Sequence, residues 1–138
     1  MASLGANAVI TGRNGNRVKS VAEKCRSRTN NKIIEVIADV TNDDDVKRLL
    51  NTTIDEFGKI DILVNNAGVS ALNLICSSDL MDIYTRIMNT NVRSVVLLSS
   101  LAVPYLEKTK GTIINISSIA AMRPVCYEII ISFNNRNF

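Results

Sequence analysis

Hydrophobic and polar positions alternate along the chain with two different periods. Short apolar runs rich in β-branched residues predict four buried strands, at 8–11, 33–38, 62–64 and 112–116. Apolar residues that recur every three or four positions predict helices between these strands, over 14–27, 43–57 and 79–108. The last stretch is long enough for two helices in sequence, with Pro104 bending the final turns.

Strands and helices therefore follow one another in regular alternation. This order predicts an α/β fold, a doubly wound parallel sheet with helices on both faces. After Val125 neither period continues, and the Ile-, Asn- and Phe-rich composition is typical of translated AT-rich, non-coding DNA. We therefore expect a domain over residues 1–125 and an aberrant tail over 126–138.

Composition excludes several classes of function. The 138 residues include 16 Lys+Arg and 13 Asp+Glu, and a net charge of +3 is too small to indicate nucleic acid as a partner. The chain has no histidine, which excludes a Ser-His-Asp triad, and we predict no metal site. Three scattered cysteines, no signal peptide and no long apolar segment favour a cytoplasmic protein that does not enter a membrane.

Residues able to carry chemistry follow the predicted strands, where open α/β sheets bind their ligands. These positions, together with Asn91 in the helical stretch before the last strand, are Gly12-Arg13, Asp39-Val40, Asn65-Asn66-Ala67-Gly68 and Ser117-Ser118. The set resembles the short-chain dehydrogenase/reductase family in order and spacing up to about Pro124. The resemblance implies a Rossmann-like sheet and hydride transfer between nicotinamide and a small-molecule carbonyl/alcohol substrate.

The resemblance also assigns cofactor contacts. Arg13 takes the place of the residue that reads the ribose, and a guanidinium without a neighbouring carboxylate implies NADP(H) rather than NAD(H). Asp39 and Val40 resemble the pair that contacts adenine, whereas Asn66, Ala67 and Gly68 resemble the turn beneath the cofactor. The alternatives are a solvated loop arginine and an aspartate that caps a turn.

Two residues resemble the family's catalytic groups. Ser118 matches the serine that hydrogen-bonds the substrate oxygen, and Asn91 matches the helical asparagine that holds a water in a proton relay. A serine at a strand end is otherwise only a turn residue. The helix around Asn91 resembles the family's dimer helix, which implies a homo-oligomer for the full-length form, although its apolar face is equally compatible with a core.

The sequence departs from the family at both ends. The family's Tyr-x-x-x-Lys motif is absent, because Tyr127 is out of register, Ile131 stands where the lysine belongs, and no lysine follows Lys110. The glycine-rich phosphate loop is absent too, since 11–15 lacks the later glycines. We expect an inactive fragment. The alternatives are a non-catalytic isoform that pairs with a full-length relative, and a gene-prediction artefact.

The departure has a structural consequence. In the family's strand order, the first strand lies between the second and the fourth. Without it, the strands at 8–11 and 33–38 are expected to separate from those at 62–64 and 112–116, and both pairs would expose hydrophobic edges. We therefore expect poor solubility and weak or no binding of NADP.

Overall fold

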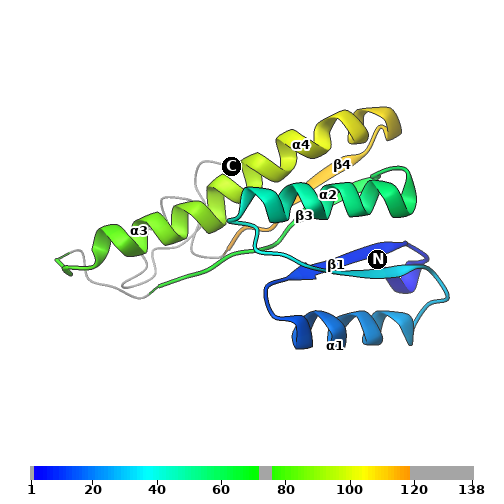
Figure 1. Cartoon of the computed structure of the whole chain (residues 1–138), viewed down its shortest axis with the longest axis horizontal. Helices are drawn as coiled ribbons and strands as arrows, with labels where there is room; N and C mark the ends of the chain where they lie inside the picture. The colour runs from blue at the N-terminus through cyan, green and yellow to red at the C-terminus, as the bar shows by residue number, and fades with distance from the viewer. Residues whose placement is uncertain (1, 72–75, 119–138) are drawn as a thin grey trace. The chain divides into compact units, whose positions relative to one another are not determined.

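The computed structural model describes residues 2–71 and 76–118 (Figure 1). The chain divides into two compact units, residues 1–59 and 60–138, and each contains its own pair of parallel strands. The tail predicted at 126–138 and Tyr127 lie outside the described residues. Within the described residues, the first two strands pair with each other and so do the last two, which is the pairing that the sequence predicts.

The first unit is a strand–helix–strand–helix arrangement. Its elements are η1 (Ala2–Leu4), β1 (Ala8–Gly12), α1 (Gly15–Arg26), β2 (Ile33–Ile37) and α2 (Asp43–Phe57). β1 and β2 are parallel, in a register that runs from Ala8 opposite Ile33 to Gly12 opposite Ile37. These bounds confirm the four predicted elements to within one or two residues.

The two helices of this unit cover opposite faces of the strand pair, as Figure 1 shows. Leu49 of α2 packs in a buried cluster with Val36 and Ala38. Ile37 lies on the other face, where a Cβ added to Gly15 at the start of α1 would lie 3.7 Å from Ile37 Cδ1. Side chains of consecutive strand residues point to opposite faces, so β2 serves both helices. The result is the three-layer packing of a doubly wound fold.

Arginines from both helices reach the backbone of β2. Arg26 of α1 donates from Nη2 to the carbonyl oxygen of Ile33 over 2.9 Å and from Nη1 to Glu35 over 2.7 Å. Arg48 of α2 donates to the carbonyl oxygen of Ile37 over 2.7 Å. Each helix is therefore joined to β2 by hydrogen bonds from an arginine side chain as well as by apolar packing.

The second unit consists of β3 (Ile62–Asn65), α3 (Leu80–Met88), the π-helical turn η2 (Asn89–Arg93), α4 (Ser94–Thr109) and β4 (Thr112–Asn115). β3 and β4 are parallel, and Asn65 stands opposite Asn115. Figure 1 shows α3 (green) continuing into α4 (yellow) along one helical path. The two helices predicted for 79–108 are thus confirmed, and a π-turn joins them. Pro104 lies inside α4.

The π-turn is stabilised by a buried serine. The backbone N–H of Ser94 donates to the carbonyl of Asn89, five residues earlier, instead of to the carbonyl four residues earlier as in an α-helix. The Ser94 hydroxyl donates to the carbonyl of Thr90 over 2.6 Å, and both residues are buried. A π-helical turn contains more residues than an α-helical turn. It therefore changes which side chains of α3 and α4 share a face. Within the described residues, no helix is long and apolar enough to cross a membrane.

Candidate functional site

The carboxyl end of β3 is fixed by a buried asparagine. The Asn65 amide donates from Nδ2 to Asn115 Oδ1 over 2.9 Å and to the hydroxyl of Ser99 over 3.1 Å. Asn65 is 8% exposed, so these hydrogen bonds satisfy an amide that burial would otherwise penalise. They join β3, β4 and α4 at one point. The exposed turn Asn66-Ala67-Gly68 therefore starts from a rigid position.

Asn91 holds the far end of the same turn. Its Oδ1 accepts from the backbone N–H of Val69 over 2.8 Å, and its Nδ2 donates to the carbonyl of Val69 over 2.9 Å. A Cβ on Gly68 would lie 3.6 Å from Asn91 Oδ1, in ordinary van der Waals contact. The side-chain amide of Asn91 thus fixes the backbone that follows the predicted cofactor turn. The role that the sequence predicts, a water in a proton relay, stays a prediction.

Ser118 lies beyond the end of β4. The β4 ladder continues past Asn115, because the N–H of Ile116 donates to the carbonyl of Asn65 over 2.9 Å. Ser118 is exposed and is the last residue that the structure describes before 119–138. Ser118 and the Asn66–Gly68 turn thus follow the carboxyl ends of two adjacent parallel strands. This is the position that the sequence predicts for Ser118.

In the first unit, Arg13 and Asp39 follow adjacent strands and form an ion pair. Arg13 Nη1 lies 3.8 Å from Asp39 Oδ2, and the two side chains are 64% and 35% exposed. The other carboxylate oxygen, Oδ1, accepts from the backbone N–H of Thr41 over 2.9 Å and from its hydroxyl over 2.7 Å. One oxygen of Asp39 therefore closes a turn, while the other faces Arg13. Val40 is half-buried within that turn.

The hydrogen bonds from Thr41 set the charge state of Asp39. The backbone N–H of Thr41, followed by its hydroxyl, lowers the pKa of Asp39 below the ordinary value, although partial burial acts in the opposite direction. Arg13 lowers the pKa further. Asp39 is therefore a carboxylate at neutral pH, able to accept a hydrogen bond from an amine.

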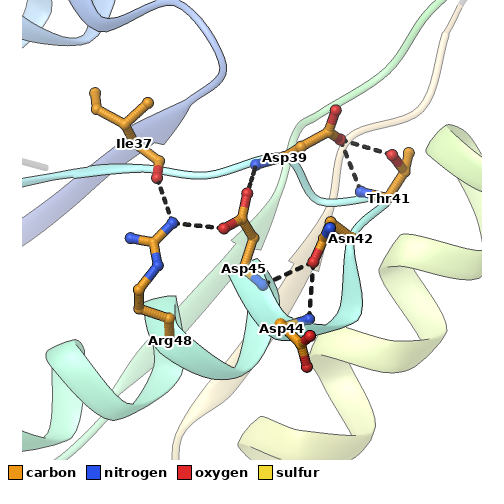
Figure 2. A network of polar contacts seen from close by, with 7 residues as sticks. All are labelled: Ile37, Asp39, Thr41, Asn42, Asp44, Asp45 and Arg48. Carbon is orange, nitrogen blue, oxygen red and sulfur yellow. Dashed lines mark hydrogen bonds and ion pairs between the residues drawn. The ribbon is translucent and has the colours of Figure 1, made fainter.

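The first turn of α2 binds the backbone N–H of Asp39, as Figure 2 shows. Asn42 caps the helix through Oδ1, which accepts from the N–H groups of Asp44 and Asp45. Asp45 Oδ2 accepts from the N–H of Asp39 over 2.8 Å, and Asp45 Oδ1 accepts from Arg48 over 2.6 Å. The N–H of Asp39, followed by the Arg48 guanidinium, lowers the pKa of Asp45 below the ordinary value.

The structure brings the predicted residues together in two groups. The first unit places Arg13 beside Asp39 and Val40, and the second places Asn91 beside the Asn66–Gly68 turn. Sequence reasoning missed the supporting residues Thr41, Asp45, Arg48, Ser94 and Ser99. The i,i+3 spacing of Asp45 and Arg48 at a helix start was a usable signal for their ion pair. The π-turn that brings in Ser94 left no comparable pattern.

The sequence and fold of this chain are similar to those of known proteins. A family model described as short chain dehydrogenase matches residues 1–129. The chain belongs to the short chain dehydrogenase family. It is 35% identical to 11-beta-hydroxysteroid dehydrogenase 1A of Arabidopsis thaliana over 120 residues, which are 87% of this chain and 34% of that protein. It is 37% identical to 11-beta-hydroxysteroid dehydrogenase-like 4A of the same plant, over 86% of this chain and 40% of that protein.

Solved members of the short chain dehydrogenase family have the same Rossmann-like fold. L-sorbose reductase from Gluconobacter frateurii, in complex with NADPH and L-sorbose, matches with a TM-score of 0.87 and 28% identity. The match covers 98% of this chain and 51% of the reductase. A 7 alpha-hydroxysteroid dehydrogenase, in complex with NADH and 7-oxo glycochenodeoxycholic acid, matches with a TM-score of 0.90 and 27% identity, over 99% and 52% of the two chains. The chain thus spans about half the length of these enzymes and about a third of the Arabidopsis relatives.

Proposed function

We propose that the chain is the nucleotide-binding part of a cytoplasmic NADP(H)-dependent oxidoreductase. The whole enzyme would transfer hydride between nicotinamide and a small-molecule carbonyl/alcohol pair. The observation that carries the choice of NADP(H) is the exposed guanidinium of Arg13, directly after β1 and beside the carboxylate of Asp39. Relatives of the same fold hold NADPH in one case and NADH in another, so the choice rests on this chain's own residue.

The residues present fit the adenosine end of such a cofactor. A 2′-phosphate suits the Arg13 guanidinium, which can bind phosphate oxygens in a planar, two-donor geometry. The exocyclic amine of adenine suits Asp39 Oδ2, because Thr41 already occupies the other carboxylate oxygen. The Asn66–Gly68 turn has no bulky side chain beyond Asn66 and leaves room for the backbone to approach a ribose.

Ser118 and Asn91 are proposed as the catalytic groups that this chain contributes. The bound nicotinamide would supply or accept the hydride with its electron pair. The Ser118 hydroxyl would hydrogen-bond the substrate oxygen, and Asn91 would hold a water of the relay that delivers the proton to that oxygen. Because the sequence holds no Tyr-x-x-x-Lys motif, we propose that these 138 residues by themselves bind nucleotide weakly and do not turn over substrate.

The test is a nuclear magnetic resonance titration of the full chain with adenosine 2′-monophosphate and adenosine 5′-monophosphate. We expect tighter binding of the 2′-phosphate, and a loss of about tenfold in that affinity for Arg13→Gln, since a hydrogen bond to a charged group contributes about 1.5–3 kcal/mol. Arg28→Gln, which removes an exposed cation beyond the other end of α1, is the control. Equal affinities of the wild type for both nucleotides would refute the proposed NADP(H) preference.

A second function is supported by the surface of α4. Val96 and Val103 are 58% and 38% exposed, and their spacing places them on one side of the helix. We propose, as the alternative, a non-catalytic subunit that pairs through α4 with a full-length relative. Co-purification of the two chains, reduced by Val96→Glu but not by Val21→Glu on the exposed side of α1, would support it. Failure to co-purify at micromolar concentration would oppose it.

A further inference from the structure

Asp45 and Arg48 hold the end of β2 from one side. Arg48 Nη2 donates to the carbonyl of Ile37 over 2.7 Å and to Asp45 Oδ1 over 2.6 Å. Asp45 Oδ2 accepts from the N–H of Asp39 over 2.8 Å. Figure 2 shows that the two side chains rise from the first turns of α2 and meet the strand at two successive backbone groups. The pair thus contacts residues 37 and 39 together.

These two backbone groups point away from β1. The N–H of Ala38 donates to the carbonyl of Gly12 in β1 over 3.1 Å. Backbone groups of consecutive strand residues face opposite edges, so the carbonyl of Ile37 and the N–H of Asp39 face the outer edge. A neighbouring strand would bond such a carbonyl and N–H in the same way. At this edge, the Arg48 donor and the Asp45 acceptor therefore replace the hydrogen bonds that a neighbouring strand would make.

The orientation of Asp39 depends on this support. Its N–H is held by Asp45 and its Oδ1 by Thr41, which leaves little freedom for rotation of the backbone at this position. Oδ2 then faces Arg13, and Val40 follows directly. If the peptide between Ala38 and Asp39 turned, the carboxylate and Val40 would both move relative to Arg13. The geometry of the proposed adenosine contacts is thus set by two residues that do not touch the ligand.

We propose that Asp45 and Arg48 are positioning residues for the adenine end of the cofactor. The inference rests on the proposed function, because it assumes that Asp39 and Val40 contact adenine. Arg48 fixes the carboxylate of Asp45, and Asp45 fixes the N–H of Asp39. The pair acts on adenine recognition and leaves the phosphate contact of Arg13 unchanged.

The same helix offers a matched control. Lys47 Nζ lies 3.6 Å from Asp44 Oδ1, with the same i,i+3 spacing and the same signs of charge as the Arg48–Asp45 pair. The Asp44 side chain is 93% exposed and pairs with Lys47 of α2, and the Asp44 N–H donates to the Asn42 cap. Asp44→Asn and Lys47→Gln therefore change the net charge and the helix end in the same way as Asp45→Asn and Arg48→Gln, without touching β2.

The experiment compares two ligands of the full chain, adenosine 2′-monophosphate and ribose 2-phosphate, which keeps the phosphate proposed to contact Arg13 and has no purine. Affinities are measured from chemical-shift changes and referred to the fraction folded in urea titrations. We expect Asp45→Ala and Arg48→Gln to lose about tenfold in affinity for the purine nucleotide and nothing for ribose 2-phosphate. Asp45→Asn, which keeps an acceptor oxygen, should lose less, and the two control variants should match the wild type.

The backbone N–H resonance of Asp39 gives an independent readout. It should shift in Asp45→Ala and Arg48→Gln and stay in place in the controls. Wild-type affinity in Asp45→Ala and Arg48→Gln would overturn the positioning role alone, and so would an equal loss for both ligands. If the wild type binds neither adenosine 2′-monophosphate nor its 5′ isomer at millimolar concentration, the proposed function fails and this inference fails with it.

Discussion

Asp39 shows how one carboxylate can close a turn and still present an acceptor. Thr41 occupies Oδ1 with two hydrogen bonds, and Oδ2 stays directed at Arg13. The sequence predicted both the cofactor role of Asp39 and, as the alternative, a turn-capping role. The capping geometry is present in the structure, and it orients the oxygen on which the proposed cofactor role depends.

The lowered pKa of Asp39 makes the stability of the first unit depend on pH. Because the folded-state pKa lies below that of the unfolded chain, ionised Asp39 stabilises the fold above the unfolded value of about 3.9. This stabilisation is lost as the pH falls through the folded-state pKa. We predict that the difference in unfolding free energy between wild type and Asp39→Asn shrinks from pH 6 to pH 3, by chemical denaturation at each pH. Thr41→Val should weaken the same trend, and a difference independent of pH would contradict this account.

Asn91 offers a second test at the scale of one residue. In Asn91→Ala the N–H and carbonyl of Val69 lose their partners in a half-buried position, and we predict a loss of about 1–3 kcal/mol in unfolding free energy. Asn89→Ala, an exposed residue of the same π-turn, is the control and should lose much less in urea denaturation. Equal losses in the two variants would show that the contact with Val69 contributes little.

Among the elements, the end of α4 departs from the usual pattern. A glycine commonly takes the left-handed position after a helix, as Gly58 does after α2 with φ of 71°. After α4 this position is taken by Lys110, with φ of 54°, and Gly111 comes next. Gly111 is needed for another reason, because a Cβ there would lie 2.5 Å from the carbonyl oxygen of Asp61. Lys110 thus takes the left-handed position, and the glycine stands at the next residue, where the backbone passes close to Asp61 just before β3.

Lys110→Gly should therefore stabilise the second unit. Relief of the left-handed conformation, offset by the greater freedom of glycine in the unfolded chain, leaves a net gain of about 0.5–1 kcal/mol. Thermal unfolding would measure it. Lys108→Gly, inside the helix, should have the opposite sign, and Gly111→Ala should be strongly destabilising. A destabilised Lys110→Gly protein would mean that the lysine makes a contact that outweighs its backbone strain.

The elements themselves were predictable because their signals are local. Apolar period, the Asn42 cap and the Gly58 stop gave the helices and strands to within a residue or two. The π-turn was not predictable, because its contact from Asn91 to Val69 joins segments that are far apart in the sequence. Likewise the partners of Asn65, which are Ser99 and Asn115, come from tertiary packing that the sequence period does not encode. Residue types at strand ends, by contrast, were enough to propose a candidate site, and the cofactor and catalytic roles of its residues stay predictions.

At the scale of the whole molecule, the described strands form two separate pairs with exposed apolar residues, which include Ile37, Ile62 and Val64. On β1, the backbone groups of Thr11 point away from β2, since the neighbouring Gly12 accepts from Ala38. An unpaired strand edge is a template for association. The expectation of poor solubility stays a prediction, and the edge of β1 provides a way to test it.

Thr11→Lys places a charge beside this edge and should weaken self-association of the chain about fivefold or more. Sedimentation velocity over a range of concentrations would measure the effect. Ser20→Lys adds the same charge on the exposed surface of α1 and is the control. If both variants associate like the wild type, the chain associates through some other surface or remains monomeric.

The two arginines that bind the backbone of β2 have a consequence for the size of any such assembly. Arg26 occupies the carbonyl of Ile33 and Arg48 that of Ile37, so both ends of the outer edge already carry donors. A sheet with two open edges can add neighbours without limit and grow into a fibre. Since both end carbonyls of the outer edge of β2 are occupied, we expect growth of the β1–β2 sheet to stop after a single partner, and through this sheet the chain should form dimers of finite size.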